Sequence, residues 1–218
     1  MARDGEEKQR ALAAVLEAEF PTVIAGCHRK NRLIDDAQVA EKHDQLCDLF
    51  EATLKFLGAV LARAYLHDGA FAPRVNQCFA NFARPSLGHW NEMIHEILTA
   101  YEQRENSPLM SSARQMYFKT TDIRREVHEA YRGIGERLPG KPPLLRHGHK
   151  DFVELMVSYR NKCWKGHGAK ISAEEYGART ALLLPGLEAW IASLSFLNAY
   201  RLVFVNEVRY EQERFHAT

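Results

Sequence analysis

Arg160, Asn161 and His167 are the residues of this chain whose types and spacing best suit chemistry on a phosphodiester. Arginine offers a fixed, bidentate cation for phosphate oxygens, and histidine titrates near neutral pH and can therefore exchange protons. RNA supplies its own nucleophile in the 2′-hydroxyl, so its cleavage needs only a proton acceptor, a proton donor and a cation. The sequence therefore predicts Arg160 as a phosphate clamp, His167 as the acid–base group and Asn161 as an orienting group, with no metal or other cofactor.

A helix must position these side chains, because an apolar helical run starting near Phe152 leads directly into Arg160. On a continuous helix the seven residues from Arg160 to His167 make nearly two turns, so both side chains share a face about 10 Å apart along the axis. The glycines on either side of His167 let it move from that ideal position. Two such helices meeting across a two-fold axis would bring both Arg-His sets into one cleft, which predicts a homodimer.

The pattern Arg160-Asn161-x5-His167, within a helical background, resembles that of the HEPN superfamily. Members of this superfamily are α-helical bundles marked by Arg-x4–6-His, often with Asn directly after the Arg. The resemblance implies a metal-independent endoribonuclease that works as a dimer with a composite site, in bacterial defence, toxin–antitoxin systems or stress response. It also implies RNA as substrate and a fused or partner effector or antitoxin protein.

Two other interpretations of the same residues remain open. Some HEPN proteins have lost catalysis, and this chain could be a non-catalytic module that dimerises or senses a ligand for a larger protein. In the plainest interpretation, Arg160 is a solvated helix residue and His167 is a C-terminal cap that interacts with the helix dipole. The chain would then be a helical scaffold.

Charge distribution favours a polyanionic partner for the same part of the chain. Residues 114–170 contain thirteen Lys and Arg against six Asp and Glu, although alternating charges on helix faces would give a similar count. The predicted RNA-binding residues are Lys162, Lys165, His147, His149 and Lys150. The two histidines are otherwise a polar loop, because they make only half a zinc site and no nearby Cys or carboxylate pair completes it.

Other candidate groups are better explained by structure. Arg84 and His89 could hold a phosphate at a helix start, but the segment also fits an N-cap at Ser86 with Trp90 as a core anchor. The glycine-rich residues 133–140 lack the preceding strand and the Gly-Lys-Ser/Thr ending of a phosphate loop. His43 and Cys47 lie four residues apart on a helix, but a metal needs further ligands.

The elements around these residues are helical almost throughout, which predicts an all-α, HEPN-like helical bundle. An apolar stripe from Leu46 to Tyr65 steps by three and four and marks one long helix. Further helices are expected over residues 6–19, from 87 to about 101, over 111–131, from 151, and over 173–200. Pro185 and Gly186 fall inside the last of these and predict a kink or a break into two helices. Residues 133–143 are the clearest breaker segment.

The C-terminal tail has a different pattern. Residues 201–205 suggest a strand, residues 206 and 207 a turn, and residues 208–215 a second strand. Because a lone hairpin is marginally stable, it either packs on the bundle or continues into another domain, and we expect the latter. The predicted division is a helical domain over residues 1–200 and a strand-like tail over 201–218, the start of a further domain.

Composition narrows the class of protein. The 218 residues fit one domain, and a net charge of +1 excludes a histone-like tail or an acidic solvating protein. No apolar stretch approaches the roughly 18 residues of a membrane span, and the charged N-terminus does not lead into a secretory signal. Four scattered cysteines without a C-x-x-C pair predict reduced thiols and a cytoplasmic location.

Overall fold

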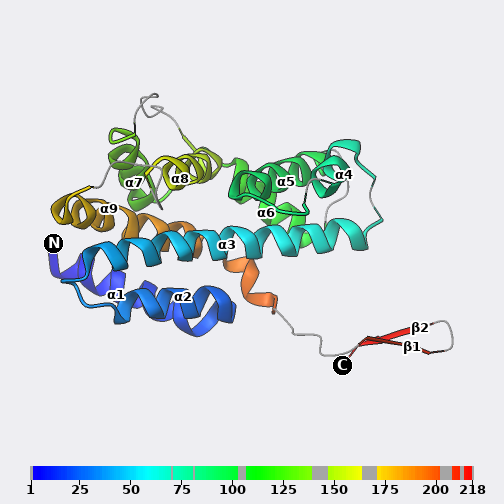
Figure 1. The fold of residues 1–218 in the computed structure, drawn as a ribbon, viewed down its shortest axis with the longest axis horizontal. Helices are drawn as coiled ribbons and strands as arrows, with labels where there is room; N and C mark the ends of the chain where they lie inside the picture. Colours follow the sequence, from blue (N-terminus) through cyan, green and yellow to red (C-terminus); the bar gives the residue numbers. More distant parts are fainter. Residues whose placement is uncertain are drawn as a thin grey trace.

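The computed structural model describes residues 2–69, 71–80, 82–102, 107–138, 147–163, 171–201, 208–211 and 214–217. Over these residues the fold is all-α, as the sequence predicts, with a short hairpin near the C-terminus (Figure 1). The helices are α1 (Ala2–Glu19), α2 (Thr22–Leu33), α3 (Val39–His67), α4 (Pro73–Ala80), α5 (Leu87–Ala100), α6 (Pro108–Phe118), α7 (Arg125–Gly135), α8 (His149–Cys163), α9 (Ala173–Ala192) and the 3-10 helix η1 (Ser195–Ala199).

The 29-residue helix α3 is the central element, and it runs the length of the bundle (Figure 1). Helices α1 and α2 lie on one side of it and α4 to α8 on the other, while α9 packs along it. The apolar stripe predicted from Leu46 to Tyr65 is the buried face of α3. Its Phe50 ring lies 5.5 Å from the ring of Trp190, the large residue of α9 at the centre of the core.

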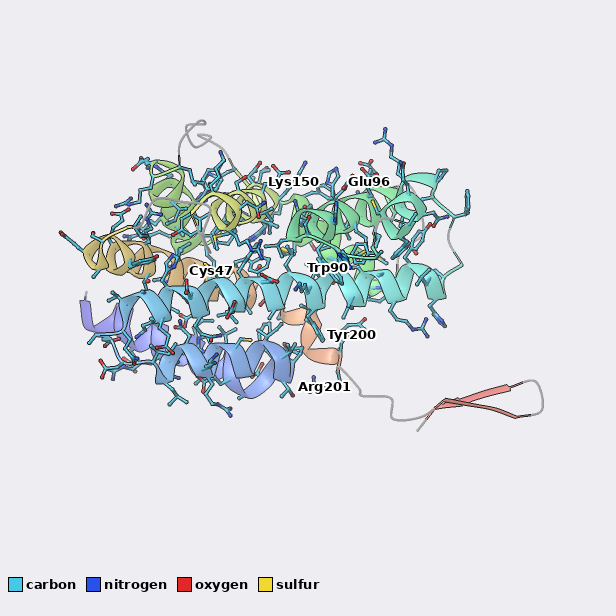
Figure 2. All side chains as sticks on the ribbon, viewed as in Figure 1. Cys47, Trp90, Glu96, Lys150, Tyr200 and Arg201 are labelled. Atoms are coloured by element: carbon cyan, nitrogen blue, oxygen red, sulfur yellow. The ribbon has the colours of Figure 1, made fainter. Side chains whose placement is uncertain are left out.

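Close helix contacts depend on small residues at two crossings. A Cβ atom on Gly58 of α3 would lie 2.6 Å from the ring of Trp90, which α5 places against α3 (Figure 2). A Cβ atom on Gly186 of α9 would lie 2.3 Å from the Cβ of Ala130 in α7. Both distances are shorter than van der Waals contact, so glycine is required for the helices to approach this closely.

Buried polar groups tie the first and last helices together. The His28 ring of α2 is fully buried, with Nδ1 at 3.2 Å from Glu17 of α1 and Nε2 at 2.6 Å from Glu188 of α9. Gln9 of α1 donates a further hydrogen bond to Glu188. Because Glu188 is itself 2% exposed, this network satisfies a carboxylate that would otherwise be costly to bury.

Several helix boundaries differ from those expected. The single helix predicted over 111–131 is wrong: α6 ends at Phe118 and α7 begins at Arg125. The backbone reverses between them at Asp122, whose φ of 51° is left-handed and incompatible with a continuing helix. Helices α2 and α4 were not predicted.

Pro185 does not divide the last helix into two, since α9 continues through it to Ala192. The buried residues Leu187 and Trp190 follow the proline, and their packing holds the helix together despite the lost backbone donor.

The tail contains a hairpin, but its position differs from the prediction. Strands β1 (Val208–Glu211) and β2 (Arg214–Ala217) pair antiparallel, with Val208 opposite Ala217 and Glu211 opposite Arg214. The segment expected to be one strand, 208–215, therefore supplies parts of two. The strand and turn predicted over 201–207 lie outside the described residues, except Arg201, which is in neither helix nor strand.

Across the described residues, no helix combines the length and the apolar character needed to cross a lipid bilayer. Cys27, Cys47 and Cys78 are free thiols, and burial raises the pKa of Cys27 and Cys78.

Candidate functional site

The site begins with α8, which carries the predicted Arg-Asn pair in its last turn. The helix buries Phe152, Val153, Met156 and Tyr159 against the bundle, and this apolar face fixes its orientation. Immediately after Tyr159, the chain presents Arg160 partly exposed and Asn161 and Lys162 exposed. The positive charges of Arg160 and Lys162 also lie at the negative end of the helix dipole, which stabilises them there.

Arg160 is held by an acidic residue of another helix. Its guanidinium Nη2 lies 3.6 Å from Oε2 of Glu51, which α3 contributes from the centre of the bundle. The other oxygen of Glu51 receives a 2.6 Å ion pair from Lys55, one turn further along α3. One carboxylate therefore joins two cations, and the side chains are 36% exposed for Arg160 and 23% for Glu51.

A buried polar cluster supports the same turn of α8 from behind. The Tyr159 hydroxyl lies 2.6 Å from Nε2 of His43 on α3 and 3.5 Å from the Arg179 guanidinium of α9. Arg179 in turn donates a 2.8 Å hydrogen bond to Glu175. The cluster fixes Tyr159, and with it the backbone that carries Arg160.

His43 is neutral in this environment. Burial of the ring, assisted by the positive charge of Arg179, lowers the pKa of His43 to about 4, although Asp44 opposes the shift. A neutral imidazole in a fully buried position can hydrogen-bond the Tyr159 hydroxyl without the cost of an interior charge. We therefore assign His43 a structural role, since its ring has no access to a substrate.

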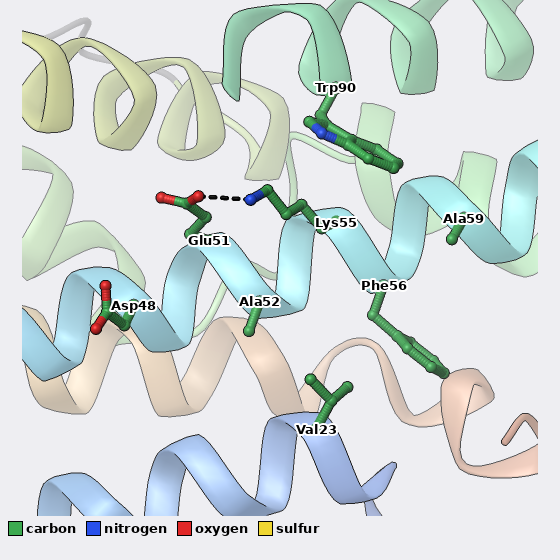
Figure 3. A pocket seen from close by; sticks show the side chains of 8 residues that line it. All are labelled: Val23, Asp48, Glu51, Ala52, Lys55, Phe56, Ala59 and Trp90. Carbon is green, nitrogen blue, oxygen red and sulfur yellow. Dashed lines mark hydrogen bonds and ion pairs between the residues drawn. The ribbon is translucent and has the colours of Figure 1, made fainter. Parts of the chain in front are cut away.

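Glu51 also lines a groove of about 490 Å³ on the exposed face of α3 (Figure 3). The groove passes between Trp90 of α5 on one side and Val23 of α2 on the other, with Phe56 and Ala59 beyond Lys55. Both Glu51 and Lys55 line the groove. Glu51, the ion-pair partner of Arg160, therefore borders an open surface.

The remaining predicted residues lie in three different situations. His167 and Lys165 fall outside the described residues. Lys150 lies partly exposed on α8 (Figure 2). It pairs with Glu154 at 3.7 Å. His147 and His149 are 2% and 4% exposed, so both rings lie in the interior.

His147 belongs to a packed aromatic group. Its Nε2 lies 2.6 Å from Nδ1 of His128, and its ring stacks on Tyr131 with centroids 3.9 Å apart. The RNA-binding roles of His147 and His149 remain predictions, and at the other end of α8 the side chains of Asn161 and Lys162 are exposed.

The structural interpretation of the other sequence candidates agrees with their geometry. Ser86 caps α5 through the amide of His89, and the His89 ring accepts from the Ser86 amide in return. Among the described residues, no group of three or more His, Cys, Asp or Glu is arranged to hold a metal ion.

Glu51 and the Tyr159 cluster were missed by sequence reasoning. The i, i+4 spacing of Glu51 and Lys55 signals only an exposed helix pair, because their connection to Arg160 requires the crossing of α3 and α8. Comparisons of the chain with protein-family models, curated proteins and solved structures find no match.

Proposed function

We propose that the chain is a HEPN-like, metal-independent endoribonuclease that acts as a homodimer in bacterial defence, toxin–antitoxin or stress response. The observation that carries the proposal is the presentation of Arg160 and Asn161. They lie in the last turn of α8, beside a surface groove, and Arg160 is oriented by Glu51 from a second helix. An arginine kept only for solubility would need no such partner.

The residues divide the reaction between them. His167 accepts the proton of the 2′-hydroxyl, whose oxygen then attacks the adjacent phosphorus while the bond to the 5′-oxygen breaks. Arg160 stabilises the charge that develops on the phosphate oxygens, and Asn161 orients the phosphate. A proton returns to the leaving 5′-oxygen from the partner subunit's acid–base group or from water. The products are a 2′,3′-cyclic phosphate and a 5′-hydroxyl, and no step requires a metal.

Glu51 has a positioning role in this scheme. In the absence of RNA its single negative charge offsets part of the positive charge of Arg160 and Lys55, and its contact with the guanidinium favours one orientation of Arg160. A phosphate that replaces Glu51 as the partner of Arg160 meets a side chain that is already oriented, which lowers the entropy lost on binding. Lys162 lies two residues after Arg160 in the last turn of α8 and is exposed, so it adds a second cation for the RNA backbone.

The test is cleavage of mixed single-stranded and structured RNA in EDTA. We expect wild-type protein to produce 2′,3′-cyclic phosphate ends, and His167→Ala and Arg160→Ala to lose the activity with unchanged helical content by circular dichroism. His67→Ala is the matched control, because His67 is exposed on α3 and lies outside the site. Cleavage that persists in both site variants would refute the assignment.

A second function is favoured by a different observation, a cavity of about 770 Å³ between the second half of α3 and the residues around η1. Its lining includes Phe56, Val60, Leu109 and Tyr200, and among the described residues it includes neither Arg160 nor Asn161. This favours a non-catalytic module that senses a ligand for a larger protein. Saturable binding of RNA or a nucleotide that survives Arg160→Ala, without any cleavage, would support this alternative.

A further inference from the structure

A polar cavity of about 310 Å³, separate from the 770 Å³ cavity beside α3, lies where α6, the α6–α7 connection, the start of α8 and η1 meet. We propose that this cavity binds a small phosphate monoester. The inference does not depend on RNA cleavage, because the cavity lies at the opposite end of α8 from Arg160, about 16 Å away along the helix axis. The residues that carry the inference are Ser112, Lys119, Arg124, His149 and Phe196.

Two unusual backbone features bring these residues together. Asp122 has a left-handed φ of 51° and lies in the α6–α7 connection, from which Lys119, Asp122 and Arg124 all line the cavity. At Gly148 the backbone approaches so closely that a Cβ atom would lie 2.4 Å from the carbonyl oxygen of Lys119. Glycine at this position therefore allows His149 to lie against the segment that carries Lys119.

The cavity has positive character from side chains and from helix ends. Arg124 is the N-cap residue of α7, which begins without a side-chain cap, and His149 is the first residue of α8. The N-terminus of a helix attracts anions through its unsatisfied amides and its dipole. At α8 the Gly148 amide already donates a 2.7 Å hydrogen bond to Asp151, so the contribution of a helix end comes from α7. Lys119 forms an ion pair with Asp122 at 3.5 Å, whereas no ion pair engages Arg124 within the described residues. Asp122 also lines the cavity, so Lys119 and Arg124 leave an excess of one positive charge in the lining, which favours an anion.

The buried ring of His149 is an independent indication of a ligand. The residue is 4% exposed and lines the cavity, and its Nδ1 has no hydrogen-bonding partner in the described part of the chain. Burial and the positive charge of Lys119 lower the pKa of His149 to about 4, so the ring is neutral at pH 7. A buried polar atom without a partner requires an explanation, and a ligand, an ion or a water bound in the adjoining cavity is one.

The lining selects a phosphate attached to a small organic group. Arg124 and Lys119 suit a doubly charged phosphate, and Ser112, Gln115 and Ser195 add neutral hydrogen-bonding groups around it. Phe196 and Met116 supply an apolar wall that inorganic phosphate would leave uncovered. A volume of about 310 Å³ is at the lower end of the range for small-molecule sites, which fits a compact monoester.

Isothermal titration calorimetry of the full chain with glycerol 3-phosphate tests the proposal. We expect saturable binding of one molecule per chain, weaker binding of inorganic phosphate, and no binding of glycerol. Arg124→Gln and Lys119→Gln should each weaken binding by about tenfold, since each removes a charge-assisted hydrogen bond. Arg124 is exposed, so its replacement should leave the circular dichroism spectrum unchanged.

Arg125→Gln is the matched control. It removes the same charge one residue further on, where the side chain is 85% exposed and pairs with Glu129, outside the cavity. Affinity within twofold of wild type is expected for this variant. The proposal is overturned if wild-type protein does not bind glycerol 3-phosphate, or if the Arg125 and Arg124 variants lose the same affinity. Binding of inorganic phosphate or succinate as tight as that of glycerol 3-phosphate would overturn the monoester assignment.

Discussion

The Arg160 guanidinium of α8 lies 3.6 Å from the Glu51 carboxylate of α3, and Glu51 simultaneously binds Lys55. This contact between residues 109 positions apart connects the predicted motif to the central helix of the bundle. It also gives the proposed phosphate clamp a defined orientation before any substrate arrives. The contact can therefore be tested separately from the chemistry of His167.

Glu51→Gln should lower kcat for RNA cleavage by about tenfold, because the guanidinium of Arg160 loses the carboxylate that orients it. KM should stay the same or fall, since a negative charge near the RNA phosphates is removed at the same time. Single-turnover and steady-state assays separate the two effects. Glu41→Gln, an exposed change at the start of the same helix, should alter neither constant. A rise in KM with unchanged kcat would contradict the positioning role.

Gly58→Ala should destabilise the protein by about 1–3 kcal/mol, because the new methyl group would overlap the ring of Trp90. Urea unfolding followed by circular dichroism measures the change. Gly26→Ala provides the control: this exposed residue of α2 has nothing within 4 Å of the added Cβ. For Gly26→Ala, helix propensity alone predicts a rise of about 0.5–1 kcal/mol in the free energy of unfolding. If both variants are destabilised, overlap with Trp90 is not the cause.

Stability should decline as the pH falls from about 6.5 towards 4, in part because of His43. Its folded pKa is about 4, lowered chiefly by burial, while the unfolded chain binds the proton near the ordinary value of 6.5. Between these values the unfolded state carries more protons and is favoured, so His43 alone contributes about 2 kcal/mol of loss between pH 7 and pH 5. Replacement by Gln should reduce the pH dependence of the unfolding free energy by that amount.

The groups that face His43 are Tyr159, Tyr176, Asp44 and Arg179. His67→Gln, a change at an exposed position, serves as the control and should leave the pH dependence as in wild type. Equal pH dependence in wild type and the His43 variant would show that the buried ring does not resist protonation.

Glu188→Gln should destabilise the bundle by about 3 kcal/mol, because it removes the charge that His28 and Gln9 satisfy in the interior. A double-mutant cycle with His28→Gln in urea isolates the contribution of the pair. We expect a coupling energy of about 1–3 kcal/mol. Additive effects of the two substitutions would mean that the hydrogen bond between them contributes little.

The sequence was sufficient where local rules decide the structure. The apolar stripe of α3 and the Ser86 cap follow from helical spacing and from the hydroxyl that satisfies an end amide. The break at Asp122 was missed: aspartate adopts the left-handed conformation more readily than most residues, but it also occurs within helices and by itself marks no helix boundary. At Pro185 the local rule predicted a kink or a break, and a break did not occur, because α9 packs on α7 through Gly186.

The candidate site was predictable only in part. The types and spacing of Arg160 and Asn161 indicated phosphate chemistry, and both lie at the end of α8. Glu51 could not be found in advance, since nothing within four residues of it points to Arg160. For His149 the sequence suggested an exposed environment in a polar loop. In the structure its ring is buried at the start of α8. Tertiary packing decides both cases.

The network around Glu188 has a consequence for synthesis on the ribosome. Glu17 and His28 emerge early, yet their partner on α9 follows His28 by 160 residues. Until α9 has been synthesised, the nascent chain therefore contains a histidine and an apolar α3 surface that lack their partner helix. Completion of the bundle must wait until α9 has left the exit tunnel, so helices α2 and α3 remain partly uncovered during that interval.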